Sequence, residues 1–235
     1  MAETPAHDQH GTSSPTDGTQ AAERGKAASP KVTISGAQSG RKLSVPNLVT
    51  IGIFVALYFL ACAVMTFTVG ALVPVIGMIL LPAATALVAG AIYFMLIAKV
   101  PKFGGITAMG LVMGIFFFMS GHFVVSFAAN VACGIAADAV ARAGRYKSRA
   151  LNMVSYVVFS YGLMGPILPM WLMKDAYVAN LVARGKDSAY IDTFFAGISS
   201  GTLVLCLVAT LVCAIVGALF GQWLLERHLK KANLA

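Results

Sequence analysis

Residues 121–149 read GHFVVSFAANVACGIAADAVARAGRYKSR, an apolar run followed directly by a basic cluster. The apolar part is long enough to cross a bilayer as a helix. Positions i and i+4 are neighbours on a helix, so His122, Ser126 and Asn130 are predicted to share one face. Every charged residue in 142–149 is basic, which is typical of a cytoplasmic loop. The segment is therefore predicted to run from outside to inside.

The composition is that of an integral membrane protein. The 235 residues are 58% hydrophobic and 11% charged, more apolar than a soluble core of this size requires. The net charge is +8, but the basic residues beyond the first 40 lie mostly in short loops between apolar runs. This distribution is typical of charges that set membrane orientation, and it does not indicate nucleic-acid binding. The four cysteines lie in apolar runs without CxxC spacing, so neither a metal site nor a disulfide framework is predicted.

The predicted fold is an all-α integral membrane protein with six transmembrane helices and both termini in the cytoplasm. Residues 1–44 are rich in Gly, Ser, Thr and Pro and are expected to form a disordered cytoplasmic tail. Residues 45–226 are expected to form the six-helix domain, and 227–235 a short basic tail. The spans are predicted at about 47–69, 72–100, 103–120, the apolar part of 121–149, 151–173 and 193–225.

Two irregular features are predicted near the outer face. The fifth span contains two glycines and two prolines between residues 162 and 169, so it should be kinked or broken there. The following loop, 174–192, balances three acids against three bases and is predicted to lie outside. Within it, residues 176–184 are expected to form a short interfacial helix that Gly185 ends.

The spans lack groups that could power transport or catalysis. Of nine acidic residues only Asp138 lies in a span, and no Lys or Arg lies near the middle of one. Asp138 and Arg142 are interpreted as a structural i, i+4 pair. The sequence contains no P-loop, HExxH or GxSxG motif. The protein is therefore expected not to be an enzyme, and energy for any transport should come from another polypeptide.

Helix breakers gather at the outer ends of the spans, at the three outer turns. Broken backbone at membrane depth is tolerated where protein or a cavity covers it. We therefore predict an outward-facing pocket roofed by residues 174–192; the alternative is that the breakers merely loosen helix ends. The predicted lining is Thr66, Phe67, Thr68, His122, Ser126, Asn130, Tyr161, Met170, Trp171, Lys174, Asp175 and Tyr177.

Three of the polar or small-residue features have two interpretations each. His122 either contacts a ligand or lies at the headgroup level facing water. Asn130 lies deeper, where an amide needs a partner, and either binds substrate or bonds a neighbouring helix. Gly52 and Ala56 form a small-xxx-small pair that allows another helix to approach closely, or that serves packing within the chain.

Several segments resemble one transporter family. They are LVTIGIFVALYFLACAV (residues 48–64), LLPAATALVAGAIYFMLIAKVPKFGGI (80–106), DAVARAGRYKS (138–148) and WLMKDAY (171–177). This texture of spans and loops is similar to the MptD-type (Trep_Strep-like) S components of energy-coupling factor (ECF) transporters, over nearly everything after Arg41.

The resemblance implies a six-helix subunit that captures a vitamin, metal or other micronutrient outside the cell. Such a subunit delivers its cargo, by toppling in the membrane, to a T component with two ATPase subunits. In the family an AxxxA motif in the first helix docks on the T component, and Gly52 and Ala56 occupy that place here. Related S components have been linked to haem uptake, which would make His122 and Met170 a candidate ligand pair.

The leading hypothesis is thus a substrate-binding S subunit in the cell membrane, surrounded by lipid and without a nucleic-acid partner or resident cofactor. Two rivals stay open. One is a self-sufficient small-molecule carrier or channel, against which the scarcity of charge in the spans counts. The other is a membrane scaffold or assembly protein without a ligand.

Overall fold

A computed structural model of the chain describes residues 43–73 and 77–232. All regular structure in these residues is helical, which confirms the predicted all-α class. The predicted tail lies almost wholly outside the described residues, as do 74–76 and 233–235. The elements are α1 (Val45–Leu72), α2 (Gly77–Lys99), α3 (Gly105–Met119), α4 (Val124–Ala143), α5 (Arg149–Ser160), η1 (Tyr161–Met164), α6 (Pro169–Leu172), α7 (Lys174–Ala183), α8 (Ser188–Ala196) and α9 (Ser200–Ala232).

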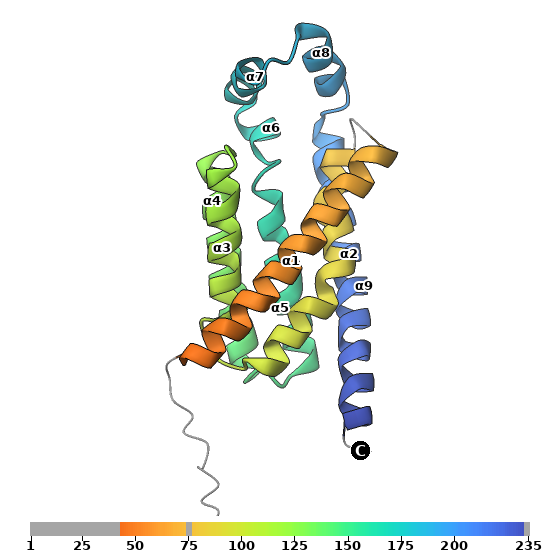
Figure 1. Cartoon of the computed structure of the whole chain (residues 1–235). Coiled ribbons are helices and arrows are strands. Elements are labelled where there is room, and N and C mark those ends of the chain that lie inside the picture. The colour runs from red at the N-terminus through yellow and green to blue at the C-terminus, as the bar shows by residue number, and fades with distance from the viewer. Residues whose placement is uncertain (1–42, 74–76, 233–235) are drawn as a thin grey trace, which may run out of the picture. The chain divides into compact units, whose positions relative to one another are not determined.

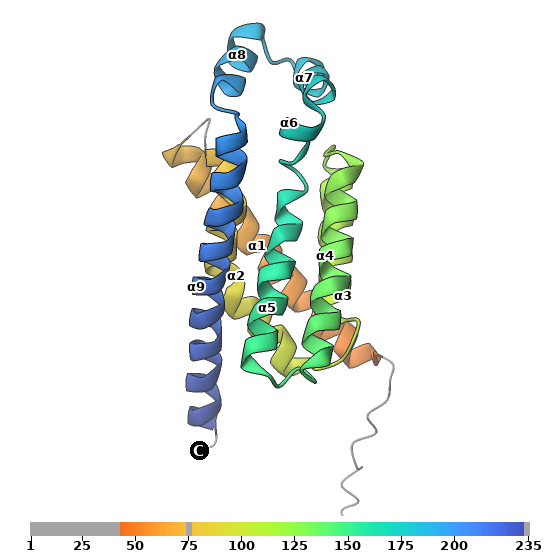
Figure 2. The same cartoon turned by 180° about the vertical axis from the view of Figure 1, so that it is seen from behind.

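The helices form a bundle with two chemically different ends. At one end, α7 and α8 lie beyond the turn that joins α3 to α4 (Figures 1 and 2). We call residues 174–196, which contain α7 and α8, the strap. At the other end lie the start of α1, the loops 100–104 and 144–148, and the end of α9 (Figure 1). The charges in 99–102 and 142–149 are all basic, so we call this the basic end.

Four helices are long and apolar enough to cross a membrane: α1, α2, α4 and α9. Helix α3 is apolar but shorter, and the fifth predicted span is broken into α5, η1 and α6. The most apolar window of α1 is only 17% buried within the chain, against 56% for α2. Such a bare apolar surface is expected where lipid covers a helix. Helix α2 is instead a central helix.

Glycines bring the backbones of α2 and α9 into direct contact. A Cβ atom added to Gly90 would overlap the carbonyl oxygen of Gly217, and one added to Gly217 would overlap the carbonyl oxygen of Ala86. Small residues are the usual means by which membrane helices approach closely, because packing rather than the hydrophobic effect drives their association in lipid. This contact fixes α2 against the longest helix of the chain.

A buried tyrosine cluster joins α2 to α4 and α5. The rings of Tyr93 and Tyr156 lie 4.9 Å apart, and both side chains are fully buried. Ser155 Oγ donates to the Ala137 carbonyl, so the Tyr93 hydroxyl donates to Ser155 Oγ at 2.7 Å. The Tyr156 hydroxyl donates to the Ala86 carbonyl at 2.6 Å. The hydroxyls of Tyr93, Tyr156 and Ser155 therefore each have a partner, as buried polar groups normally do.

The predicted break in the fifth span is confirmed. The α-helix stops at Ser160 and continues as the 3-10 helix η1, followed by turns up to α6. Helix α4 covers this irregular backbone closely, since a Cβ atom on Gly165 would stand 2.8 Å from Ser126 Cα. Protein rather than lipid therefore surrounds the backbone groups that the break leaves outside regular α-helical hydrogen bonding.

The sixth span begins later than predicted, at Ser200 instead of about 193, and its helix extends to Ala232. The reason is a cap between Ser199 and Thr202. The Ser199 amide donates to Thr202 Oγ1 at 2.8 Å, and the Thr202 amide donates to Ser199 Oγ at 3.2 Å. This reciprocal pair starts a new helix. Residues 193–196 belong to α8 and thus to the strap.

Asp138 has a structural role, but its partners differ from the predicted Arg142. Its Oδ2 accepts hydrogen bonds from the Gly104 amide (2.7 Å), the Thr107 amide (3.0 Å) and Thr107 Oγ1 (2.9 Å). Its Oδ1 accepts one from the Tyr146 hydroxyl at 2.8 Å. The Arg142 guanidinium lies over the Phe103 ring, 5.4 Å from its centroid. The carboxylate thus caps the start of α3 and holds both loops of the basic end.

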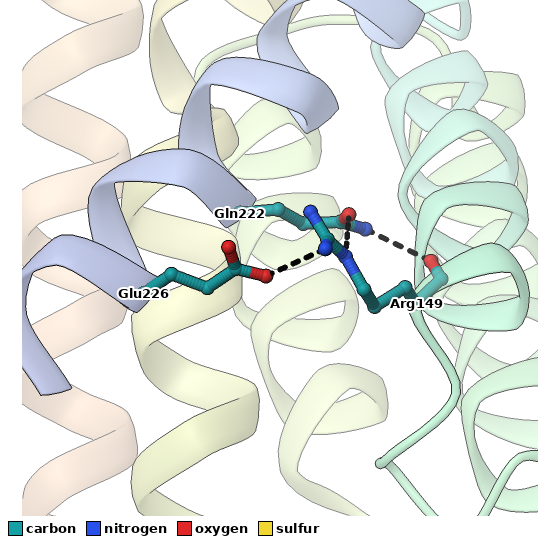
Figure 3. A network of polar contacts seen from close by, with 3 residues as sticks. All are labelled: Arg149, Gln222 and Glu226. Carbon is teal, nitrogen blue, oxygen red and sulfur yellow. Dashed lines mark hydrogen bonds and ion pairs between the residues drawn. The ribbon is translucent and has the colours of Figure 1, made fainter. Parts of the chain in front are cut away.

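A polar contact ties α5 to α9 at the same end (Figure 3). Arg149 Nη1 forms an ion pair with Glu226 Oε1 at 2.8 Å, and Gln222 Nε2 donates to the Arg149 carbonyl at 2.8 Å. The charged side chains are partly exposed, so the ion pair itself adds little stability. The hydrogen bond from the Gln222 side-chain amide to the first turn of α5 sets the spacing of the two helices.

Gly217→Ala should destabilise the isolated protein, because the added methyl group must push α2 away from α9. We expect a cost of about 1–3 kcal/mol, a fall of several degrees in the midpoint of thermal unfolding in detergent. Gly52→Ala is the matched control, since no atom lies within 4 Å of a Cβ atom at that position. Equal midpoints for the two variants would contradict the close backbone contact.

Asp138→Asn should also destabilise the protein, because an amide NH₂ group would face donors that the carboxylate now accepts from. Leaving such buried donors unpaired costs about 1–3 kcal/mol or more. The same substitution at the exposed Asp192 is the control. A thermal midpoint for Asp138→Asn equal to that of the control would show that the carboxylate does not hold the loops.

Candidate ligand-binding cavity

A cavity of about 570 Å³ opens between the bundle and the strap. This volume is within the usual range for small-molecule sites. It is lined from α1, α2, α3, the α3–α4 turn, the irregular part of the fifth crossing, and both helices of the strap. The lining is mainly aromatic and aliphatic, and includes Phe59, Cys62, Thr66, Phe67, Met78, Leu81, Thr85, Met113, Phe116, Phe117, His122, Phe123, Ile167, Met170, Tyr177, Asn180, Leu181, Arg184, Lys186, Tyr190 and Phe194.

Five of the twelve residues predicted from the sequence line this cavity: Thr66, Phe67, His122, Met170 and Tyr177. These residues come from separate parts of the chain, and the fold brings them together at one cavity. The clustering of helix breakers had indicated a pocket in this region. The strap contributes to the lining through both of its helices. Helix α7 matches the predicted short helix closely, and Gly185 follows it with a φ of +77°, a backbone conformation that favours glycine.

Ser126, Asn130 and Thr68 do not line the cavity. Ser126 and Asn130 are buried and face the broken segment: Asn130 Oδ1 would be 3.2 Å from a Cβ atom on Gly162. Asn130 Nδ2 donates to the Ser126 carbonyl at 2.8 Å, so its amide is used within its own helix. Thr68 is exposed and its hydroxyl donates to the Val64 carbonyl. Each residue turns an α-helix by about 100°, so Thr66 and Thr68 lie about 200° apart and point to different sides of α1.

Tyr161, Trp171, Lys174 and Asp175 also lie outside the lining. The first two stabilise the connection to α9: Tyr161 donates to the Leu207 carbonyl at 3.0 Å, and Trp171 Nε1 to the Ser199 carbonyl at 2.9 Å. The Lys174 ammonium lies over the Phe195 ring at 5.0 Å. Asp175 is exposed in the first turn of α7, where an acid favours the helix.

His122 lies in the turn before α4 and not on the helical face predicted for it. Gly121 has a φ of +80°, which reverses the chain, and α4 begins only at Val124. The His122 ring packs edge-on against Phe117, with centroids 5.3 Å apart. Its Nδ1 atom is buried without a hydrogen-bond partner. Burial lowers the pKa of His122; the backbone of Phe117 opposes this shift, and the nearby Arg184 charge adds to it, so the neutral imidazole is favoured.

Four aromatic rings of the lining stack in a near-parallel row, which we call the aromatic ladder. Phe123 and Tyr177 are 6.0 Å apart at 21°, Tyr177 and Phe194 are 6.0 Å apart at 7°, and Phe194 and Tyr190 are 6.1 Å apart at 13°. The ladder joins the α3–α4 turn to both helices of the strap. All four side chains line the cavity, so the ladder contributes aromatic, largely apolar surface to it.

The charged residues of the lining are both basic. Arg184 Nη2 donates to the Gly121 carbonyl at 2.6 Å and so ties the strap to the α3–α4 turn. The Lys186 ammonium lies over the Tyr190 ring, 4.7 Å from its centroid. The loop's acids lie elsewhere; Asp187, for example, caps α8 by accepting from the Tyr190 amide at 2.8 Å. The neutral sum of the loop charges therefore conceals a basic inner surface.

Sequence reasoning missed the contributions of Asn180, Arg184, Lys186, Tyr190 and Phe194. A signal for some of them was present in helical spacing. Tyr177, Leu181 and Arg184 follow an i, i+4, i+7 pattern on one face of α7, and Tyr190 and Phe194 follow i, i+4 on α8. Counting the loop's net charge hid this pattern.

The described part of the chain contains no group of three or more His, Cys, Asp or Glu side chains that could hold a metal ion. His122 and Met170, the pair considered for haem, both line the cavity. The Met170 side chain is nevertheless almost fully buried, with 1% of its surface exposed.

The predicted docking pair lies on a bare surface. Gly52 and Ala56 are both exposed on α1, and a Cβ atom on Gly52 would have no neighbour within 4 Å. Packing within the chain, the alternative interpretation of this pair, therefore does not explain the small residue at Gly52.

A family model described as "Hypothetical bacterial integral membrane protein (Trep_Strep)" matches residues 45–231, most of the chain. No curated protein and no solved structure matches the chain. The match agrees with the apolar helices of the fold. The chain is thus a multi-pass protein of the cell membrane.

The cavity predicts which cysteines a water-soluble reagent can reach. In a background with the four native cysteines replaced, Thr66→Cys should react with a membrane-impermeant thiol reagent added to intact cells. Ser126→Cys should react at least about tenfold more slowly, because that position is fully buried against the fifth crossing. Equal rates would contradict the lining described above. Reaction of Thr66→Cys only after permeabilisation would reverse the predicted orientation.

Proposed function

Because the chain belongs to the Trep_Strep family of bacterial integral membrane proteins, we propose that it is the substrate-binding S subunit of an ECF-type importer. In this proposal it captures a micronutrient at the strap end, on the outer face, and delivers it to a T component with two ATPase subunits. It has no catalytic activity of its own. The resemblance of its spans and loops to S components supports this assignment.

The observation that carries the proposal is the cavity beneath the strap. It combines a volume of about 570 Å³, a largely apolar lining and a few polar groups, which are the usual features of small-molecule sites. A scaffold protein would have no need for such a space.

The distribution of charge favours an external energy source. In the membrane-crossing helices, the charged residues are Lys99, Asp138, Arg142, Arg149 and those from Glu226 onward, all near the basic end. The hydrogen bonds of Asp138 engage both of its oxygens. Ion-coupled carriers usually keep ionisable groups at membrane depth. This chain is therefore suited to binding cargo, and a separate motor would drive its release.

Helix α1 supplies a surface for the T component. Its exposed Gly52 and Ala56 leave a shallow, smooth strip beside bulky apolar residues such as Leu48 and Leu60, which are 52% and 58% exposed. Small residues allow a partner helix to approach closely within lipid. The rest of the described chain leaves most of α1 uncovered, so a partner helix can reach this strip.

Co-purification separates this proposal from its rivals. Recovery of a T component and ATPase subunits with the tagged chain supports the S-subunit assignment. Substrate accumulation in proteoliposomes that contain the chain alone, without ATP, would instead identify a self-sufficient carrier. A scaffold or assembly protein would bind partners but no small molecule, which mass spectrometry of the purified protein tests.

Gly52→Leu and Ala56→Leu should weaken assembly with the T component while leaving the cavity intact. Overpacking at a helix contact costs about 1–3 kcal/mol, so we expect recovery of the T component to fall at least about fivefold. Ala71→Leu, an exposed site at the other end of α1, is the matched control. Unchanged recovery in both test variants would exclude this strip as the docking site.

A further inference from the structure

The cavity has a charge bias that neither the family nor the resemblance assigns. Its lining contains Arg184 and Lys186, and no Asp or Glu. Neither cation forms an ion pair with an acid within the described ranges 43–73 and 77–232. Both side chains are exposed, so solvent screens part of their charge, but a cavity lined by two cations and no acid still attracts anions.

Arg184 retains donors for a ligand. Its Nη2 donates to the Gly121 carbonyl at 2.6 Å, but a guanidinium carries five N–H groups in a fixed planar fork. The fork matches the two oxygens of a carboxylate or the oxygens of a phosphate. Its bond to Gly121 holds it beside His122, which also lines the cavity. The free N–H groups of Arg184 are therefore the main hydrogen-bond donors at this point of the cavity.

The wall next to these groups is aromatic and flat. The aromatic ladder of Phe123, Tyr177, Phe194 and Tyr190 has interplanar angles of 21°, 7° and 13° between successive rings. Lys186 lies over the Tyr190 ring at the end of this row. The ladder thus places aromatic side chains beside positive charge, an arrangement that suits a molecule with one aromatic part and one anionic part.

We propose that the cargo is a planar aromatic or conjugated anion whose ring lies against the aromatic ladder and whose carboxylate or phosphate is held by Arg184 and Lys186, with His122 as a further hydrogen-bonding partner. This proposal names the substrate class and rests on the proposed function as a substrate-binding subunit. A neutral or cationic vitamin of the same size would leave the two cations without a counter-charge.

The test compares two probes that differ only in charge, 2-naphthylacetate and 2-naphthylacetamide. Binding of each to the full chain in nanodiscs is measured by saturation-transfer NMR and calorimetry, with empty nanodiscs subtracted. We expect the acetate to bind at least about tenfold more tightly than the acetamide, since a charge-assisted hydrogen bond to a guanidinium is stronger than a neutral one. Equal affinity, tighter binding of the acetamide, or no specific binding of the acetate would overturn the proposal.

Three variants connect the preference to the named residues. Lys186→Gln and Arg184→Gln should each reduce the ratio of the two affinities at least about threefold, and Arg184→Lys should retain part of it. Lys174→Gln removes one positive charge from the same strap, outside the cavity lining, and should leave the ratio unchanged. An equal reduction in Lys174→Gln would show a general surface effect and contradict the assignment. Lys186→Gln keeps the test valid if loss of the Arg184 contact to Gly121 disorders the strap.

The outcomes of this test are separate from those for assembly. If the acetate shows no preference while Gly52→Leu still blocks recovery of the T component, the substrate class is wrong and the subunit role stands. If the preference holds but no T component or ATPase is recovered, the cavity is an anion site in a protein of another function.

Discussion

The close backbone contact between α2 and α9 is the constraint on which the arrangement depends. Lipid does not force helices together as water does, so position must come from packing and hydrogen bonds. At Gly90 and Gly217 the two main chains touch without intervening side chains. With α2 held there, its Tyr93 side chain is buried in the core and its Thr85 lines the cavity. The buried hydroxyls of the tyrosine cluster then set the positions of α4 and α5 relative to α2.

The broken part of the fifth crossing borders the bundle on one side and the cavity on the other. Ile167, in the turns after η1, and Met170, in α6, line the cavity. The irregular backbone is shielded by α4 through the contact of Gly165 with Ser126. Structural support and ligand space thus come from the two sides of one segment. Ser126 and Asn130 lie on the α4 side of this segment, and they are therefore buried and outside the cavity.

Much of the fold follows from sequence patterns, because hydropathy and loop charge are local signals. The helical class, the break after Ser160 and the helix before Gly185 were all predictable, since each depends on a few neighbouring residues. The site was only partly predictable. Whether Tyr161 faces a cavity or the Leu207 carbonyl depends on how separate helices pack, which no local pattern encodes. The inner surface of the strap was missed because Arg184 and Asp187 cancel in a sum of charges but point to different surroundings.

The confinement of charge to the basic end has an electrical consequence. Carrying one elementary charge across the membrane potential involves about 2.3 kcal/mol per 100 mV. From residue 43 to residue 137 the helices hold no charged side chain before Lys99 and none from Phe103 to Ala137, and Asp138 lies in the last third of α4. Moving only the middle of these spans through the field would therefore carry little protein charge. Under the proposed function, the voltage dependence of a transport cycle would come mainly from the cations of the strap, the charges of the basic end and the charge of the cargo.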